Sequence, residues 1–258
     1  MNISSMLESI NRIDSETSNA INMLDENMRF LFNKLLAEIE SFKKALMSEQ
    51  FRQNASRAGY NTEYKAACRL LKNAARDDLH QAWKNEKGQV CACDGFTGIR
   101  LTEPKYALPL LDHQAIDLDA LFNKTISEIS AEEENMPDYS ALKTYFKTVT
   151  AEFKAKHSSK VLSAIKSCHN GYLPIYYRFE TNGAYVSVEY LLTAMEIVPD
   201  AKLSTTPSAF CPVYLKGENA EAIVLPVRIY PADFEYSSRA NADSAALRAG
   251  TYFSTIPA

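Results

Sequence analysis

Glycine and proline are absent from the first 58 residues of this 258-residue chain, and long uncharged apolar runs are absent from all of it. No stretch approaches the length needed to cross a bilayer, and no basic segment followed by an apolar one opens the chain. An excess of positive charge is also missing, because the net charge is −4. Contact with a nucleic acid would therefore require a local basic stripe. These absences predict a soluble, cytoplasmic protein without a membrane partner.

Cysteine is scarce, and its five positions are scattered, which predicts reduced thiols in a chain large enough to fold without disulfides. The cysteines are Cys68, Cys91, Cys93, Cys168 and Cys211. Cys91 and Cys93 fall on one face of an expected strand, and Cys168 with His169 offers two further metal ligands. The spacing differs from that of common zinc knuckles, so buried thiols are the favoured interpretation and no metal site or cofactor is expected.

Recognisable catalytic patterns are missing as well. The four histidines lie in different segments, with no nucleophile motif nearby: His80, His113, His157 and His169. There is no glycine-rich phosphate loop and no pair of carboxylates spaced for acid–base work. The sequence therefore predicts a binding protein and no enzyme, and an enzyme with an unrecognised site is the weakest of three interpretations.

What is present begins with an N-terminal helical arm, predicted over residues 1–60. Apolar residues recur at helical spacing, Ser5 and Glu8 fit a capping box, and Gly59 is a stop signal. One long helix and a helical hairpin both fit this pattern. Packing of the arm on its own domain is favoured over a self-associating coiled coil, because the heptad is imperfect.

A second helix is predicted from Thr62 to Arg76, with four cations on one face: Lys65, Arg69, Lys72 and Arg76. Two strands then flank the residues 85–88, which are typical of a hairpin loop, and Asp94-Gly95 forms a second turn before a strand up to Leu101.

Residues 104–170 change to loops and helices and are interpreted as a helical insertion. Strand patterns return from Leu173 to Phe179, and a short helix is expected from Val188 to Ile197. Three more strands are expected at residues 201–205, 212–215 and 222–229, followed by a poorly ordered tail over residues 232–258.

The order of these elements is a duplicated unit, and three segments resemble one domain of the bacterial DNA polymerase sliding clamp, its β subunit. They are the turn Cys93 to Gly98, the helix entry Val186 to Met195 and the closing strand Ala222 to Ile229. The resemblance covers residues 62–103 and 171–230, less than half of the chain. It implies an α+β fold, with a single sliding-clamp-like (DNA clamp) domain over residues 61–231. Known clamp subunits have three such domains, so a ring would require self-association.

In the clamp family, helices line the DNA channel and touch the backbone through long cations. The resemblance therefore implies duplex DNA binding by Lys65, Arg69, Lys72 and Arg76, whereas the alternative is an ordinary solvated helix face. Glu189, Thr193 and Glu196 are expected to be exposed on the companion helix, where the two carboxylates would repel phosphate.

The resemblance also implies a pocket for a linear peptide of a polymerase or repair protein. Its residues would be Cys93, Gly95, Phe96 and Thr97 from the turn and Ile223, Leu225 and Pro226 from the strand. Thr97 and Gly98 replace the family's arginine and leucine, and a complete pocket is expected to need two chains. Core packing of the strand residues is the favoured alternative.

The leading hypothesis is a clamp-like binding protein of bacterial or mobile-element DNA metabolism. The alternative is an interaction protein with the same fold that does not bind DNA and assembles as a homo-oligomer through its N-terminal helices.

Overall fold

The structure is a computed structural model that describes residues 3–21, 26–132, 138–168, 173, 175–179, 181–199, 201–227 and 251–253. The chain divides into two compact units. The first comprises Met1–Tyr64 with Lys105–Pro109, and the second comprises Lys65–Pro104 with Leu110–Ala258.

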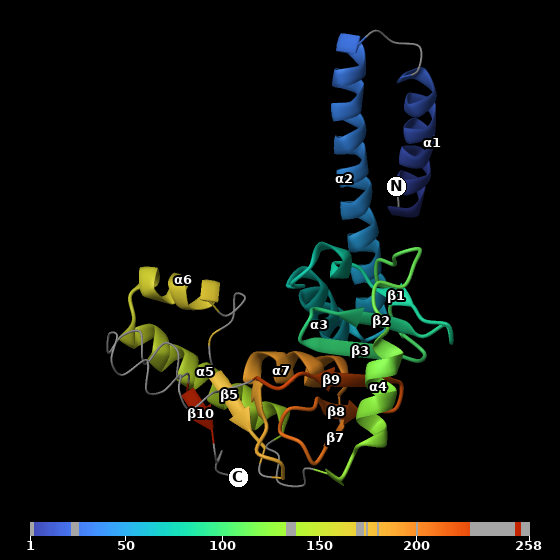
Figure 1. Ribbon diagram of the computed structural model, residues 1–258. Coiled ribbons are helices and arrows are strands. Elements are labelled where there is room, and N and C mark those ends of the chain that lie inside the picture. Colours follow the sequence, from blue (N-terminus) through green and yellow to red (C-terminus); the bar gives the residue numbers. More distant parts are fainter. Residues whose placement is uncertain are drawn as a thin grey trace. The chain divides into compact units, whose positions relative to one another are not determined.

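The first unit is a helical hairpin in which α1 (Ile3–Ile21) and α2 (Glu26–Arg57) lie side by side and antiparallel (Figure 1). The helical prediction for the N-terminal arm is confirmed over Ile3–Ile21 and Glu26–Arg57. Gly59 ends α2 with φ of 82°, while Tyr60 N–H bonds Ala55 O at 2.9 Å. This is a left-handed helix stop that favours glycine, because a side chain there would be strained.

The second unit is α+β. Its helices begin with α3 (Asn61–Lys72), which belongs to this unit from Lys65 onward. The others are η1 (Asp77–Leu79), α4 (Leu118–Ser127), α5 (Tyr139–Lys156), α6 (Ser159–Cys168) and α7 (Val188–Ile197). Its strands are β1 (Trp83–Lys84), β2 (Val90–Cys93), β3 (Thr97–Leu101), β4 (Ala131–Glu132), β5 (Ile175–Arg178), β6 (Tyr185–Ser187), β7 (Lys202–Thr205), β8 (Val213–Lys216), β9 (Ala220–Val224) and β10 (Thr251–Phe253).

Most strands join one antiparallel sheet of seven, in the order β1-β2-β3-β9-β8-β7-β4. The strands before residue 104 are thus paired to those after residue 201, because β3 lies beside β9 with Gly98 opposite Ile223. A smaller sheet has the order β10-β5-β6. The predicted hairpin and turns are confirmed, since Trp83 pairs with Cys91 and Cys93 pairs with Gly98.

The large sheet is covered on both faces, because alternate strand residues point to opposite sides. On one face, Ile223 and Trp83 pack with Leu118 and Phe122 of α4 in a buried apolar cluster. A Cβ added at Gly98 would meet Leu118 Cδ2 at 3.0 Å, so α4 lies directly on the sheet. The expected insertion therefore contributes α4 to the core of the second unit.

The other face carries α7, which contacts β3 and β9. The helices α3 and α7 are neighbours, because Arg69 on α3 donates hydrogen bonds to Thr193 and Glu196 on α7. The predicted extent of α7 is also confirmed.

The predicted end of α3 at Arg76 is wrong, since the helix ends at Lys72. Ala75 N–H, which would continue the helix by bonding Leu71 O, instead donates to Asp94 O at 2.9 Å. The Leu71 carbonyl accepts instead from Ala74 N–H at 3.3 Å and lies 2.8 Å from His80 Nδ1. A tertiary contact with the turn thus ends the helix, and Arg76 lies outside it.

The last predicted strand was placed at residues 222–229, but β9 ends at Val224 and residues 228 and 229 lie outside the described residues. Of the expected C-terminal tail, only β10 is described, and it pairs with β5 in parallel, with Tyr252 opposite Tyr176. No helix in the described ranges combines the length and apolar character that a membrane span requires.

Candidate functional site

The four predicted DNA-contacting cations do not form one exposed row. Lys65 and Lys72 are exposed on α3, and neither makes an ion pair among the described residues. Arg69 is paired with Glu196, and Arg76 is paired with Asp78 beyond the end of the helix. Two of the four positive charges are therefore already balanced within the chain.

Glu196 was expected to be exposed, but only 13% of its side chain is accessible. It accepts hydrogen bonds from Arg69 and from Tyr139 on α5, and Lys143 Nζ lies at 3.5 Å. Burial raises the pKa of Glu196, but these hydrogen bonds outweigh burial and hold it below its usual range.

Glu189 and Thr193 on α7 were also expected to be exposed, and this expectation is wrong as well. Thr193 is buried and donates to the Glu189 carbonyl at 2.9 Å, and burial raises the pKa of Glu189. The reason is that α5 packs on α7. Glu196 therefore binds neighbouring cations and Glu189 is half-buried, so the two carboxylates do not form an acidic surface.

The two halves of the predicted peptide pocket come together in one chain, because they flank the β3–β9 pairing. Cys93, Thr97 and Ile223 are buried, and Cys93 and Ile223 belong to the cluster under α4. The other four are partly exposed: Gly95, Phe96, Leu225 and Pro226. Phe96 stacks on Tyr190 with ring centroids 5.2 Å apart, and Leu225 N–H donates to Phe96 O at 2.8 Å. Core packing thus accounts for three of the seven residues.

Asp94 organises the turn between β2 and β3. Its Oδ1 accepts from Phe96 N–H at 2.8 Å and from Thr97 N–H at 2.6 Å, and the residue is 2% exposed. Burial raises the pKa of Asp94 to about 6, although the two N–H groups favour the charged form.

This carboxyl predicts a pH-dependent difference between the protein and Asp94→Asn. A raised folded pKa contributes stability that is present below about pH 4 and is lost as the pH rises through about 6. Asparagine keeps an acceptor at the same position but carries no charge. We expect the free energy of unfolding of Asp94→Asn to exceed that of the wild type by roughly 2–3 kcal/mol at pH 7.5. At pH 4 the two free energies of unfolding should be about equal. Urea titrations at both pH values measure this, and a difference that does not change with pH would contradict it.

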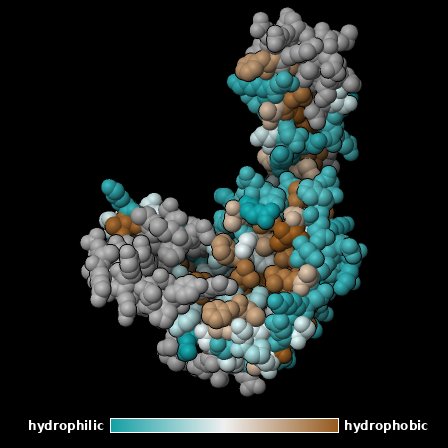
Figure 2. Space-filling model, in the orientation of Figure 1, coloured by the Kyte–Doolittle hydropathy of each residue, from teal (hydrophilic) through white to brown (hydrophobic). Residues whose placement is uncertain are grey.

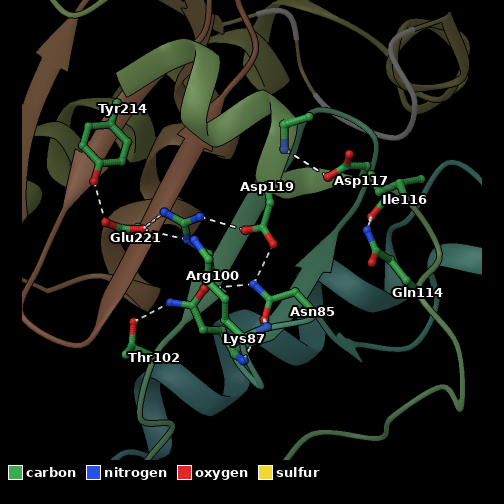
Figure 3. Close-up of polar contacts among 12 residues, drawn as sticks. Asn85, Lys87, Arg100, Thr102, Gln114, Ile116, Asp117, Asp119, Tyr214 and Glu221 are labelled. Carbon is green, nitrogen blue, oxygen red and sulfur yellow. Dashed lines mark hydrogen bonds and ion pairs between the residues drawn. The ribbon is translucent and has the colours of Figure 1, made fainter. Parts of the chain in front are cut away.

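A polar network that the sequence did not predict lies between the sheet and α4 (Figure 3). Arg100 on β3 donates to Glu221 on β9 through Nε at 2.8 Å and to Asp119 on α4 through Nη1 at 2.8 Å. Tyr214 Oη donates to Glu221 at 2.6 Å, and Asn85 Nδ2 donates to Asp119 at 2.8 Å.

The Arg100 network holds a buried cation between two carboxylates, and the guanidinium also lies 4.5 Å from the centroid of the Phe122 ring. Burial alone would lower the pKa of Arg100, but Asp119 and Glu221 together raise it, so the guanidinium stays charged. Burial and the bond to Glu221 raise the pKa of Tyr214, so its hydroxyl stays protonated. The sequence held one sign of this network, namely Arg100 itself, a charged residue between Ile99 and Leu101. The structure shows both faces of that strand buried.

An apolar hollow of about 230 Å³ lies on the helical hairpin and is called the hairpin groove. It is lined by Ile10, Ile13, Leu35, Glu38, Ile39 and Phe42. Leu35 and Phe42 are 46% and 52% exposed, although large apolar side chains are usually buried. In Figure 2, apolar residues of the hairpin show between polar ones at the surface.

The thiols on β2 are buried, and burial raises the pKa of Cys91 to about 12 and that of Cys93 to about 11. Both thiols are thus protonated and poorly reactive. Over the parts of the chain that the structure describes, no group of three or more His, Cys, Asp or Glu residues could hold a metal ion. Cys168 and His169, the other suggested ligands, have no described side chains.

Comparisons of the chain with protein families, with characterised proteins and with solved structures gave no match.

Proposed function

We propose that this protein is a non-enzymatic interaction protein that assembles with a second copy of itself through the α1–α2 hairpin. The observation that carries the proposal is the hairpin groove, with Leu35 and Phe42 exposed on α2. An apolar stripe of this kind on a two-helix hairpin is stabilised when a further pair of helices covers it.

The charges of the two helices favour a second copy as the occupant. Helix α1 has three acidic residues and one arginine, a net charge of −2, whereas α2 has six basic and four acidic residues, a net charge of +2. A two-fold axis that places α1 of one copy beside α2 of the other brings opposite charges together, and symmetric pairing is the commonest form of assembly. The product is a four-helix bundle.

Light scattering on the full chain tests this proposal. The expected molar mass is twice the 28.9 kDa of one chain, falling toward the single-chain value on dilution. A mass of one chain at all concentrations would refute self-assembly.

A second candidate function is contact with duplex DNA by a clamp-like second unit. It is supported by the exposed Lys65 and Lys72 on α3, which make no ion pair within the part of the chain that the structure describes, and by the repeated order of one helix and three strands in each half. Against it stand the ion pairs that occupy Arg69 and Arg76.

The DNA candidate predicts weak, sequence-independent binding with a shallow salt dependence. Two phosphate contacts give a slope of roughly −1.8 in a plot of log affinity against log salt concentration, whereas four would give roughly −3.6. Lys65→Glu combined with Lys72→Glu should abolish binding without changing stability, because both side chains are exposed. Fluorescence anisotropy of a labelled duplex at low salt measures both effects, and the absence of binding by the wild type would reject this candidate.

A further inference from the structure

A second hollow, of about 440 Å³, lies on the large sheet beside the C-terminal end of α4 and is called the sheet hollow. Ile126 and Ile129 form an apolar wall, Ser204 and Tyr214 come from β7 and β8, and Lys202 and Lys216 stand on the same two strands. Its volume falls within the range of sites for small organic molecules.

The charges at the sheet hollow are arranged in one row across four strands. Register places Lys202 opposite Lys216, Lys216 opposite Glu221, and Glu221 opposite Arg100. The Glu221 carboxylate already accepts hydrogen bonds from Arg100 and Tyr214. No ion pair joins it to Lys216 among the described residues.

Lys216 makes no ion pair among the described residues, and Lys202 has only a distant one, with its Nζ 3.8 Å from Glu132 Oε2. That pair is weak because both side chains are mostly exposed, at 77% and 59%. Like charges directly opposite one another on neighbouring strands destabilise a sheet. An anion placed between the two ammonium groups would remove that repulsion.

We propose that the sheet hollow binds a small organic monocarboxylate with an apolar body. The carboxylate lies between Lys202 and Lys216, and the body packs against Ile126 and Ile129, of which Ile126 is 37% exposed. This binding function is separate from assembly through the hairpin groove and does not depend on it.

The test compares three probes on the full chain at low ionic strength, with saturation-transfer NMR titrations of the ligand signals and calorimetry for phosphate. Benzoate has both the negative charge and the apolar body of the proposed ligand. Benzyl alcohol has the apolar body alone, and inorganic phosphate has the negative charge alone. We expect benzoate to bind roughly tenfold or more tightly than either of the other two, because each lacks one half of the interaction.

Two matched variants locate the site. Lys216→Met keeps the aliphatic stem and should weaken benzoate binding roughly tenfold, whereas Lys84→Met removes an exposed lysine from β1 of the same sheet and should leave it unchanged. Lys216→Met should also unfold at a slightly higher urea concentration without ligand, because the like-charge repulsion is gone. Equal binding of benzoate and benzyl alcohol, equal binding of phosphate and benzoate, no binding of benzoate, or an equal effect of both variants would each overturn the proposal.

Discussion

Replacing Arg100 with methionine is expected to lower the free energy of unfolding by about 3–5 kcal/mol at pH 7. The guanidinium side chain is 8% exposed and is shared by Asp119 and Glu221, which are themselves 21% and 18% exposed. Methionine fills much of the space against Phe122 but leaves two poorly solvated carboxylates without a cation. Urea unfolding followed by tryptophan fluorescence measures the loss, since Trp83 is in the same apolar cluster as Phe122.

Two controls separate charge from packing in this experiment. Arg76→Met removes an exposed ion pair with Asp78 and should cost at most about 1 kcal/mol. Adding Asp119→Asn and Glu221→Gln to Arg100→Met removes the unbalanced charges and should recover most of the stability. A loss below about 1 kcal/mol for Arg100→Met alone would show that the Arg100 network does not hold α4 to the sheet.

A second large effect is expected on assembly. The double variant Leu35→Glu with Phe42→Glu should be monomeric. Burying one such apolar side chain contributes about 1.5–3 kcal/mol, and a two-fold interface contains each position twice. Losing these contributions raises the dissociation constant roughly a thousandfold or more. Light scattering across a dilution series measures the change in molar mass.

Ala37→Glu is the matched control for this variant, because it adds a carboxylate at an exposed position of α2 outside the hairpin groove. It should keep the wild-type mass. Both variants should retain the helical signal in circular dichroism, since the altered side chains are already exposed in one copy. The hairpin groove would not be the interface if Ala37→Glu were also monomeric. The same conclusion would follow if the double variant kept the wild-type mass.

Local chemistry made several elements predictable. The β2–β3 turn was visible because Asp94 accepts from the two following N–H groups and Gly95 takes a φ of 100°, both of which the residues themselves favour. The boundaries of α7 were visible from its apolar residues. For the N-terminal arm the sequence left one long helix and a helical hairpin both open, and the contact of α1 with α2 shows that it is a hairpin.

The rest depended on contacts between distant residues. The end of α3 was misplaced because Asp94 O, outside the helix, takes the N–H of Ala75. Arg100 and Glu221 are 121 positions apart, so their ion pair follows only from the pairing of β3 with β9. The burial of Cys93 and Ile223 was favoured from the sequence, but α4 as the helix that covers them could not be expected, because no local pattern indicates where α4 packs.

The lengths of the outermost strands of the large sheet bear on how copies of this chain can meet. Both β1 and β4 have only two residues, and each carries an exposed charge, Lys84 at one edge and Glu132 at the other. A long, flat, uncharged edge strand is a template onto which further chains can add without limit. With its edges short and charged, this sheet offers little backbone for such growth. Growth into fibres through the edges of this sheet should therefore be disfavoured.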